Sequence, residues 1–488
     1  MKRSRARFGH NHNDKPDASA FRLIRVTFFS TEMADSPWPM DNGGLDSRPE
    51  TNPRTRHGRP LLMATANLNR RIEALEVRRI CVIKPSALGD VVQSLPLLPV
   101  LHERFPNARI DWVINHELAD LLVGHPHLDE LLPFHRRGTA RQYLHLLHEL
   151  RERQFDLVFD LQGLMRSGLM AAATGAPLRV GLETSREGAG FACHLTIPQT
   201  GKGIPAFQRY WRIAEELGVG ERPPQTIVHT ADSDRAWATS ELRGLSGPIL
   251  AIHPGARWMT KRWPVEKFAV VANKAMRQYG FSVVILGSKN EVPVANELQT
   301  LLQGFVSRKT VLNLTGKTSL KQLTAVLSAV DVVLTNDSGP MHLAAGLGTS
   351  VLGVFTCTSP TISGPPGEQH ELVATQVSCA ASYKKQCPHS GRTHLCCMDE
   401  LSTERVCAGL VRLIEKRRLH TRAANFRNAD DIVDAERNAI DTFSCQTEHP
   451  APRQVRQSGW AARNAANVVL TLNLPQQRMA GHDVVSLN

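Results

Sequence analysis

The sequence of 488 residues lacks long hydrophobic runs. No apolar stretch reaches the ~18 residues that a membrane-spanning helix needs. The apolar segment Phe21–Phe29 is short and interrupted by arginines, so we do not interpret it as a signal peptide. Because 42% of the residues are hydrophobic and 21% are charged, we expect a soluble globular protein with two or three domains.

Aromatic residues are also scarce, at 6% of the chain. The formal net charge of +12 indicates an acidic partner. This partner is nucleic acid, an anionic membrane surface or a phosphorylated substrate. The shortage of aromatics, together with the lack of zinc-finger spacing or an RNA-binding aromatic motif, argues against nucleic acid.

Nine cysteines are too few for a disulfide scaffold in a chain of this length, and we expect reduced thiols in the cytoplasm. The segment Cys379–Cys397 holds four cysteines and two histidines but no pair spaced as CxxC. Since the spacing typical of a tetrahedral metal site is missing, the pattern favours a flexible loop over a zinc or iron–sulfur centre. We predict no metal and no cofactor.

Strands and helices alternate through the middle of the chain. In the first half, apolar strands are predicted at 79–84, 108–114, 155–163 and 178–182, and helical spacing at 91–105, 117–124 and 136–154. In the second half, strands are predicted at 248–256, 281–288, 310–316, 331–337 and 350–356. Such alternation predicts an α/β protein with two doubly wound parallel sheets and a cleft between them.

The composition also suggests domain boundaries. We expect an irregular extension over residues 1–76, within which Met63 is an alternative start, and an irregular tail over 421–488. Between them we place a first domain at 77–222, a linker rich in proline and glycine at 223–247, and a second domain at 248–420.

The stretch Thr335–Gly348 combines a strand end, a polar turn and a helix start. Backbone N–H groups at a helix start have no partner within the helix, so they can receive an anion such as a diphosphate. The same residues also suit an ordinary capped helix, with Asp337 or Ser338 as the cap and Pro340 in the first turn. The local pattern leaves both interpretations open.

Two more loops follow the carboxyl ends of predicted strands, where doubly wound sheets bind ligands. Asp90 ends the first loop, where it either caps a helix or acts as a general base. Lys261 and Arg262 lie in the second loop, where they are either surface charges or groups that neutralise a departing diphosphate.

Four segments in this order resemble glycosyltransferase family 9, the heptosyltransferases. They are IKPSALGDVVQSLPLLPVL, FDLQGLMRSGLMA, HPGARWMTKRWP and TNDSGPMHLAAGLGTSVLGVF. The resemblance implies a GT-B fold, in which a first Rossmann-like domain binds the acceptor and a second binds the nucleotide sugar. It also implies an inverting, metal-independent transfer from ADP-heptose. The segment 181–198 is most similar to the enzymes that add the first heptose.

The resemblance assigns roles to individual residues. Asp90 matches the catalytic base of the family and Lys261 matches the lysine at the donor phosphates. The residues that match donor-binding positions are Ser86, Gly89, Lys261, Arg262, Glu291, Thr318, Asp337, Ser338, Gly339 and His342. The candidate acceptor contacts are Arg136, Arg137, Arg141, Arg166 and Arg186. A basic surface helix and a packed core histidine are the simpler explanations for the arginines and for His342.

The expected function is therefore transfer of heptose from ADP-heptose to Kdo-lipid A or to a heptosylated inner core of lipopolysaccharide. We expect the enzyme in the cytoplasm, in peripheral contact with the anionic inner membrane, and without a nucleic-acid partner. The alternatives are a related transferase with another nucleotide sugar or acceptor, and a non-catalytic relative that binds glycans or nucleotides. The presence of both Asp90 and Lys261 argues against the latter.

Overall fold

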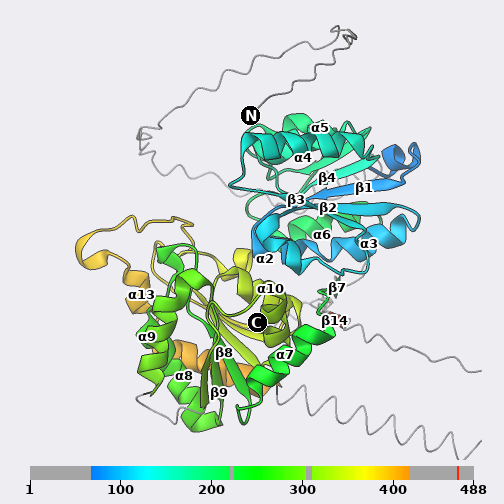
Figure 1. Ribbon diagram of the computed structural model, residues 1–488. Helices are drawn as coiled ribbons and strands as arrows, with labels where there is room; N and C mark the ends of the chain where they lie inside the picture. The colour runs from blue at the N-terminus through cyan, green and yellow to red at the C-terminus, as the bar shows by residue number, and fades with distance from the viewer. Residues whose placement is uncertain (1–67, 220–224, 304–309, 418–469, 472–488) are drawn as a thin grey trace, which may run out of the picture. The chain divides into compact units, whose positions relative to one another are not determined.

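The computed structural model describes residues 68–219, 225–303, 310–417 and 470–471 (Figure 1). Most of the expected extension at 1–76, including Met63, lies outside the described residues, and so does the tail at 421–488 apart from 470–471. No helix among the described residues is long and apolar enough to cross a membrane.

The first half of the chain forms a parallel sheet in the order β3-β2-β1-β4-β5-β6. Its strands are β1 (Arg79–Ile83), β2 (Arg109–Asn115), β3 (Glu130–Phe134), β4 (Leu157–Asp160), β5 (Leu178–Leu182) and β6 (Leu195–Ile197). Its helices are α2 (Leu88–Ser94), α3 (Leu97–Arg104), η2 (His116–Leu121), α4 (Ala140–Glu152), α5 (Met165–Thr174), η3 (Ala189–Ala192) and α6 (Ala206–Glu216). The sequence pattern missed β3 and β6, which are the two edge strands of this sheet.

The second half repeats the same order, β10-β9-β8-β11-β12-β13, also with parallel pairing. Its strands are β8 (Ile249–His253), β9 (Ser282–Ile285), β10 (Val311–Asn313), β11 (Val332–Asn336), β12 (Ser350–Phe355) and β13 (Glu371–Ala374). Its helices are η4 (Met259–Lys261), α8 (Val265–Tyr279), η5 (Lys289–Glu291), α9 (Val292–Gln303), α10 (Leu320–Ala329), α11 (Gly339–Gly346), α12 (Pro360–Ser363), η7 (Gly391–Thr393) and α13 (Cys396–Glu400). Residues 403–417 form one more helix. The predicted α/β class with two doubly wound sheets is confirmed.

Alternating side chains of the strands fill separate cores on the two faces of each sheet. Helices α4 and α5 cover one face of the first sheet, and α3 and α6 cover the other (Figure 1). In β1, Ile80 and Val82 join the cluster of α3 and α6, whereas Cys81 and Ile83 pack under α4 and α5. The first of these clusters continues into the second half, where it includes Met341 of α11. Apolar packing therefore connects the two halves.

Two predicted segments differ in the structure. The helix predicted over 91–105 is two helices, because Pro96 has no N–H to donate and its ring blocks the preceding turn. The predicted linker 223–247 contains the short strand β7 (Gln225–Thr226), paired with β14 (Leu470–Thr471), and the helix α7 (Asp232–Leu242). Helix α7 packs against α10.

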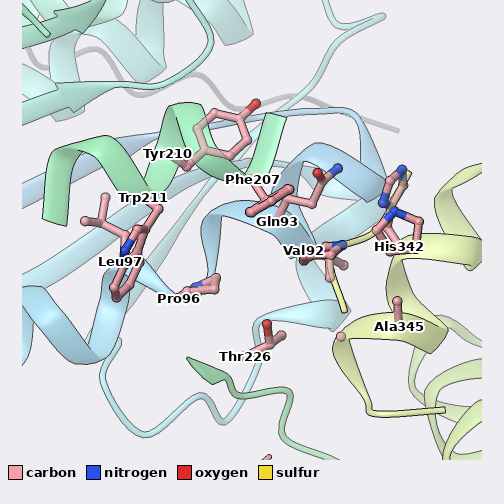
Figure 2. Close-up of a pocket in the computed structure, with 13 residues that line it drawn as sticks. Val92, Gln93, Pro96, Leu97, Phe207, Tyr210, Trp211, Thr226, His342 and Ala345 are labelled. Atoms are coloured by element: carbon pink, nitrogen blue, oxygen red, sulfur yellow. The ribbon is translucent and has the colours of Figure 1, made fainter. Parts of the chain in front are cut away.

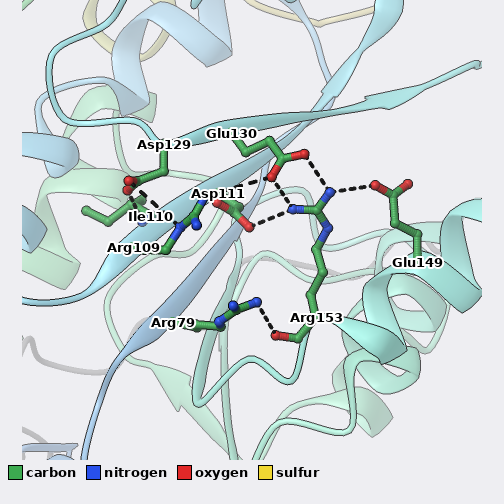
Figure 3. A network of polar contacts seen from close by, with 8 residues as sticks. All are labelled: Arg79, Arg109, Ile110, Asp111, Asp129, Glu130, Glu149 and Arg153. Carbon is green, nitrogen blue, oxygen red and sulfur yellow. Dashed lines mark hydrogen bonds and ion pairs between the residues drawn. The ribbon is translucent and has the colours of Figure 1, made fainter.

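A polar network joins the amino ends of β1, β2 and β3 (Figure 3). Arg153, which follows α4, donates to Asp111 Oδ2 at 3.2 Å, to Glu130 Oε1 at 2.7 Å and to Glu149 Oε1 at 2.7 Å. Asp111 is 3% exposed. Burial raises the pKa of Asp111, and the charge of Arg153 opposes that rise.

We expect Arg153→Met to lower the free energy of unfolding by about 3 kcal/mol, because it leaves the buried Asp111 without a counter-charge. The matched control is Arg141→Met at the start of α4, which removes an exposed arginine and should change the free energy by less than about 0.5 kcal/mol. Urea unfolding of both variants measures the difference, and equal stabilities would contradict a structural role for the network.

Candidate active site

Both sheets present loops at the point where the strand order reverses. This point lies between β1 and β4 in the first sheet and between β8 and β11 in the second. Doubly wound sheets bind ligands there, beyond the carboxyl ends of the strands. Asp90, Lys261 and Asp337 lie in the segments that follow β1, β8 and β11, respectively.

The helices that begin after two of these loops, α2 and α11, pack directly against each other. Glycines permit the approach. A methyl group on Gly89 of α2 would lie 2.5 Å from Cδ2 of His342, and one on Gly339 of α11 would lie 2.9 Å from Leu88. One end of each helix is therefore held beside the other, which brings Asp90 close to the second half of the chain.

Asp90 lies in the first turn of α2 and accepts two hydrogen bonds. The Tyr210 hydroxyl donates to Oδ1 at 3.2 Å, and the Ala87 N–H donates to Oδ2 at 3.2 Å. Burial favours the neutral acid, but Lys84, the Ala87 N–H, His342 and Tyr210 together outweigh it and hold the pKa of Asp90 below its ordinary value. Asp90 is therefore a carboxylate at neutral pH.

Lys84, which the sequence analysis did not select, lies beneath Asp90. It is 3% exposed, and its Nζ lies 5.1 Å from the centre of the Tyr210 ring. Burial lowers the pKa of Lys84, while the charges of Asp90 and Asp160 raise it. The signal was available in the sequence, because a lysine that ends a buried apolar strand needs a nearby counter-charge.

Lys261 faces the start of α11. Its Nζ donates to Asp337 Oδ2 at 2.7 Å and lies 4.9 Å from the centre of the Trp258 ring. Asp337 is 6% exposed. The structure thus brings together two of the predicted donor residues as an ion pair.

The loop around Lys261 is tied to its neighbours by hydrogen bonds. The Trp263 N–H donates to Asn336 Oδ1 at 3.1 Å, and the Thr260 hydroxyl donates to the Lys384 carbonyl at 2.8 Å. Arg262 is exposed, and its Nε donates to the Ala256 carbonyl at 2.7 Å. In this structure Arg262 therefore fastens its own loop.

The start of α11 carries no side-chain cap. Ser338 occupies the cap position, but its hydroxyl lies 3.1 Å from Thr335 Oγ1 and 3.3 Å from His253 Nδ1 instead of bonding to the helix. The first backbone N–H groups therefore keep their capacity to receive an anion. His342, one turn further on, is 8% exposed, and burial lowers its pKa.

Glu291 connects the ends of β8 and β9. Its Oε2 accepts from the Ser288 N–H at 2.7 Å and lies 3.5 Å from His253 Nε2. Burial raises the pKa of Glu291. The pKa is nevertheless lowered to about 2, because His253 contributes a hydrogen bond and charge and Ser288 donates further hydrogen bonds. A side chain on Gly255 would collide with Glu291, since a Cβ there would lie 1.7 Å from Oε1.

Two threonines, Thr315 and Thr318, follow β10, the strand that pairs with β9. Thr318 is half-buried in the turn before α10. Thr315 is 5% exposed, and within the described residues its hydroxyl has no hydrogen-bond partner. Its methyl would contact a Cβ on Gly287, which in turn lies beside Glu291. The buried hydroxyl of Thr315 is a candidate that the sequence analysis missed.

The five arginines predicted to bind the acceptor lie around the carboxyl edge of the first sheet. Arg136 and Arg137 follow β3, Arg141 and Arg166 belong to the first turns of α4 and α5, and Arg186 follows β5. All five are exposed. Arg166 donates to the Arg136 carbonyl at 3.5 Å, and the charge of Arg186 lowers the pKa of Lys84.

The sequence matches the family model of glycosyltransferase family 9 (heptosyltransferase) over residues 143–392. The chain belongs to glycosyltransferase family 9.

Proteins named as heptosyltransferases are similar to this chain by pairwise comparison. A lipopolysaccharide core heptosyltransferase of Haemophilus influenzae is 29% identical over 61% of this chain and 84% of its own length. Lipopolysaccharide heptosyltransferase 2 of Escherichia coli is 27% identical over 60% of this chain and 87% of its own length. Lipopolysaccharide heptosyltransferase 1 of Pseudomonas aeruginosa is 26% identical over 64% of this chain and 88% of its own length.

Two solved structures share the fold. The E. coli ADP-heptose heptosyltransferase II matches with a TM-score of 0.57 at 24% identity, over 70% of this chain and 99% of that one. A family 9 transferase of Veillonella parvula matches with a TM-score of 0.60 at 24% identity, over 70% and 98%. The predicted GT-B fold is confirmed by these matches.

In this family 9 chain an apolar pocket lies between α2, α6 and α11 (Figure 2). It is lined by Val92, Gln93, Pro96, Leu97, Phe207, Tyr210, Trp211, Thr226, His342, Ala345, Gly346, Pro365 and Pro366. Tyr210 and His342 belong both to this pocket and to the surroundings of Asp90, whereas Asp90, Lys261 and Asp337 do not line it. The pocket adjoins the candidate site and is distinct from its charged part.

The cysteine-rich segment packs beside the Lys261 loop. Besides the bond from Thr260 to Lys384, the Tyr383 N–H donates to the Cys357 carbonyl at 2.8 Å. Among the residues that the structure describes, no group of three or more histidine, cysteine or acidic side chains is arranged to hold a metal ion. The segment is thus joined to the candidate donor site through its backbone.

We expect Gly89→Ala to destabilise the protein, because the added methyl group meets the His342 ring at 2.5 Å. A second change, His342→Ala, should relieve that collision, so the two effects should be coupled by about 1 kcal/mol or more. Thermal unfolding of the two single variants and the double variant measures the coupling. Strictly additive effects would show that α2 and α11 do not approach as described.

Proposed function

We propose that this protein transfers heptose from ADP-heptose to a sugar hydroxyl of the lipopolysaccharide inner core. The observation that carries the proposal is the packing of α2 on α11, which places the Asp90 carboxylate beside the uncapped helix start and the Lys261–Asp337 pair. The names of the relatives support the reaction class. One E. coli heptosyltransferase of this fold has been solved with ADP.

Asp90 is proposed as the general base. An acceptor hydroxyl gives its proton to Asp90 while its oxygen forms a bond to the anomeric carbon of the donor. The bond from that carbon to the diphosphate oxygen breaks, and its electron pair leaves with ADP. A single displacement of this kind inverts the anomeric configuration.

Lys84 and Tyr210 are proposed to keep Asp90 ionised and correctly oriented. Tyr210 holds one carboxylate oxygen in place, and the buried ammonium of Lys84 favours the ionised form. The proton that Asp90 receives can then pass to solvent, since Asp90 is partly exposed.

Lys261 and the start of α11 are proposed to stabilise the departing diphosphate. Asp337 holds the Lys261 ammonium in position through one of its three protons, which leaves two for phosphate oxygens. Ser338, Gly339 and His342 belong to the same helix start. The ammonium of Lys261 and the partial positive charge at the start of α11 supply what a divalent cation supplies in other transferases, so we propose a metal-independent reaction.

The remaining donor contacts are proposed along β8, β9 and β10. Glu291 suits the ribose hydroxyls, because its low pKa keeps it an acceptor of hydrogen bonds. Thr318 is the proposed neighbour of the adenine, and the unpartnered hydroxyl of Thr315 is an additional candidate. Ser86 and Gly89 approach from the first half, and Arg262 fastens the loop that carries Lys261.

The acceptor is proposed to be an acidic glycolipid. Five exposed arginines at the carboxyl edge of the first sheet suit carboxylates and phosphates. From the resemblance over 181–198 we propose transfer of the first heptose to Kdo-lipid A. Relatives named heptosyltransferase 1 and heptosyltransferase 2 match at 26% and 27% identity, so overall similarity does not choose between the steps. We place the enzyme on the cytoplasmic face of the inner membrane.

The direct test is release of ADP from ADP-heptose with Kdo-lipid A, with a heptosylated acceptor and with no acceptor. We expect Asp90→Asn to lower kcat by about a thousandfold, because an amide cannot take the proton. The amide oxygen still accepts from the Ala87 N–H, so the variant should stay folded and bind ADP with unchanged affinity. EDTA should leave the wild-type rate unchanged.

The control for this test is Asp120→Asn, which alters an exposed carboxylate of η2 and should keep full activity. If Asp90→Asn turns over at the wild-type rate, Asp90 is not the base. If the wild-type protein releases no ADP with either acceptor, the proposed donor or acceptor is wrong, and a panel of nucleotide sugars then identifies the donor.

We expect Lys84→Met to shift the acid limb of the kcat profile to higher pH by about one unit or more. The positive charge of Lys84 lowers the pKa of Asp90, so removing it raises that pKa and protonates the base at a higher pH. Lys317→Met, which removes an exposed lysine, is the control. An acid limb that stays in place would exclude this role for Lys84.

A further inference from the structure

Exposed apolar side chains concentrate on one face of the first half. The described residues hold eight large apolar side chains that are strongly exposed, and four of them lie on α4, α5 and η3. They are Leu144 at 63% exposure, Phe191 at 60%, and Met165 and Leu169 at 41% each. We call these four residues the apolar face.

The elements that carry the apolar face are contiguous. Helix α4 packs on α5, and α5 packs on η3. Figure 1 shows α4 and α5 side by side over the same side of the first sheet. The Tyr143 hydroxyl of α4 donates to the Arg166 carbonyl of α5 at 2.8 Å, and the methyl of Met165 lies 3.4 Å from the Cβ position of Gly188, just before η3. The four side chains therefore belong to one surface.

Positive charge borders this surface at the edge nearest the candidate site. Arg136, Arg137, Arg141, Arg166 and Arg186 lie there, and none of them forms an ion pair with another described residue. Of the carboxylates close by, Glu187 accepts the Met165 N–H at 3.2 Å, and Glu149 and Glu152 lie at the far end of α4, paired with Arg153 and His148. The apolar face is therefore bordered by positive charge along its edge nearest the candidate site.

We propose that the apolar face and its five arginines dock on an anionic lipid bilayer. Partly exposed leucine, methionine and phenylalanine side chains beside arginines are the combination that binds at the headgroup boundary. The positive charge of this surface favours a membrane as the partner instead of a second copy of this chain. Two copies would bring the same arginines together, and like charges repel. Docking of this kind needs no complementary pocket.

This placement deepens the proposed function, on which its biological meaning rests. The arginines lie at the carboxyl edge of the sheet that also carries Asp90, and the charge of Arg186 acts on Lys84. In this arrangement a lipid-anchored acceptor would approach Asp90 from the carboxyl edge while its acyl chains stay in the bilayer. The same arginines serve lipid phosphates and the acidic acceptor.

The test uses the full-length protein and sedimentation with vesicles of phosphatidylcholine, with and without phosphatidylglycerol. The variant Leu144→Ser/Leu169→Ser/Phe191→Ser removes most of the apolar face, and Val123→Ser/Val270→Ser removes exposed apolar side chains elsewhere as the control. We expect the wild type and the control to bind anionic vesicles, and the triple variant to bind at least about fivefold more weakly. Circular dichroism confirms that each variant is folded.

A charge variant, Arg136→Gln/Arg137→Gln/Arg141→Gln, should lose binding to anionic vesicles, and added salt should weaken wild-type binding. Wild-type affinity of the triple apolar variant for vesicles would overturn the proposal. It would also be overturned if the wild type ignored vesicles and formed a dimer that the triple variant cannot form.

Activity assays separate this proposal from the proposed reaction. With an acceptor freed of its acyl chains, the triple apolar variant should match the wild type. With the same acceptor embedded in vesicles, it should be at least about fivefold slower. If no heptose transfer occurs with any acceptor, the proposed function fails, whereas the vesicle measurements still decide the docking surface.

Discussion

The close approach of α2 and α11 is the constraint on which the candidate site depends. Each helix follows a loop at the carboxyl edge of a different sheet. Gly89 and Gly339 leave room for His342 and Leu88, respectively, so the two helix starts can pack without a layer of side chains between them. Without that approach, the proposed base on one half and the proposed diphosphate site on the other would not share a substrate.

The charges of the site are arranged in two layers. Beneath Asp90, the buried Lys84 and the hydroxyl of Tyr210 favour a carboxylate that is ready to take a proton. Across from it, Lys261 faces Asp337 at the uncapped start of α11. The proposed transfer of a sugar from a diphosphate requires a preorganised base and a preorganised cation at opposite ends of one displacement.

Arginines have different surroundings at the amino ends and at the carboxyl ends of the strands of the first sheet. At the amino ends of β1, β2 and β3, arginines are neutralised by carboxylates in a network that supports the fold (Figure 3). At the carboxyl edge, five arginines lack such partners among the described residues and border the apolar face. The same residue type therefore stabilises one edge and is available to acidic ligands at the other.

Much of the architecture could be predicted from the sequence. Alternating apolar strands and helices indicated the class, and the loops with Asp90, Lys261 and Asp337 were placed at strand ends, because both features depend on local periodicity and turn chemistry. Strand order, the edge strands β3 and β6, and the division of the helix at Pro96 depend on packing partners far away in the chain.

The roles of single side chains could not be predicted from local sequence patterns, because they too depend on partners far away in the chain. From the sequence, Lys84 is only the end of a predicted strand. The fold shows that its ammonium faces the ring of Tyr210. The sequence indicated Arg262 as a donor contact, which stays a prediction, and only the fold shows that its Nε also donates to the Ala256 carbonyl of its own loop. The sequence by itself determined which elements form and which residues end them. The tertiary structure decided which of those residues meet, because burial, hydrogen-bond partners and pKa shifts arise from contacts between segments distant in the chain.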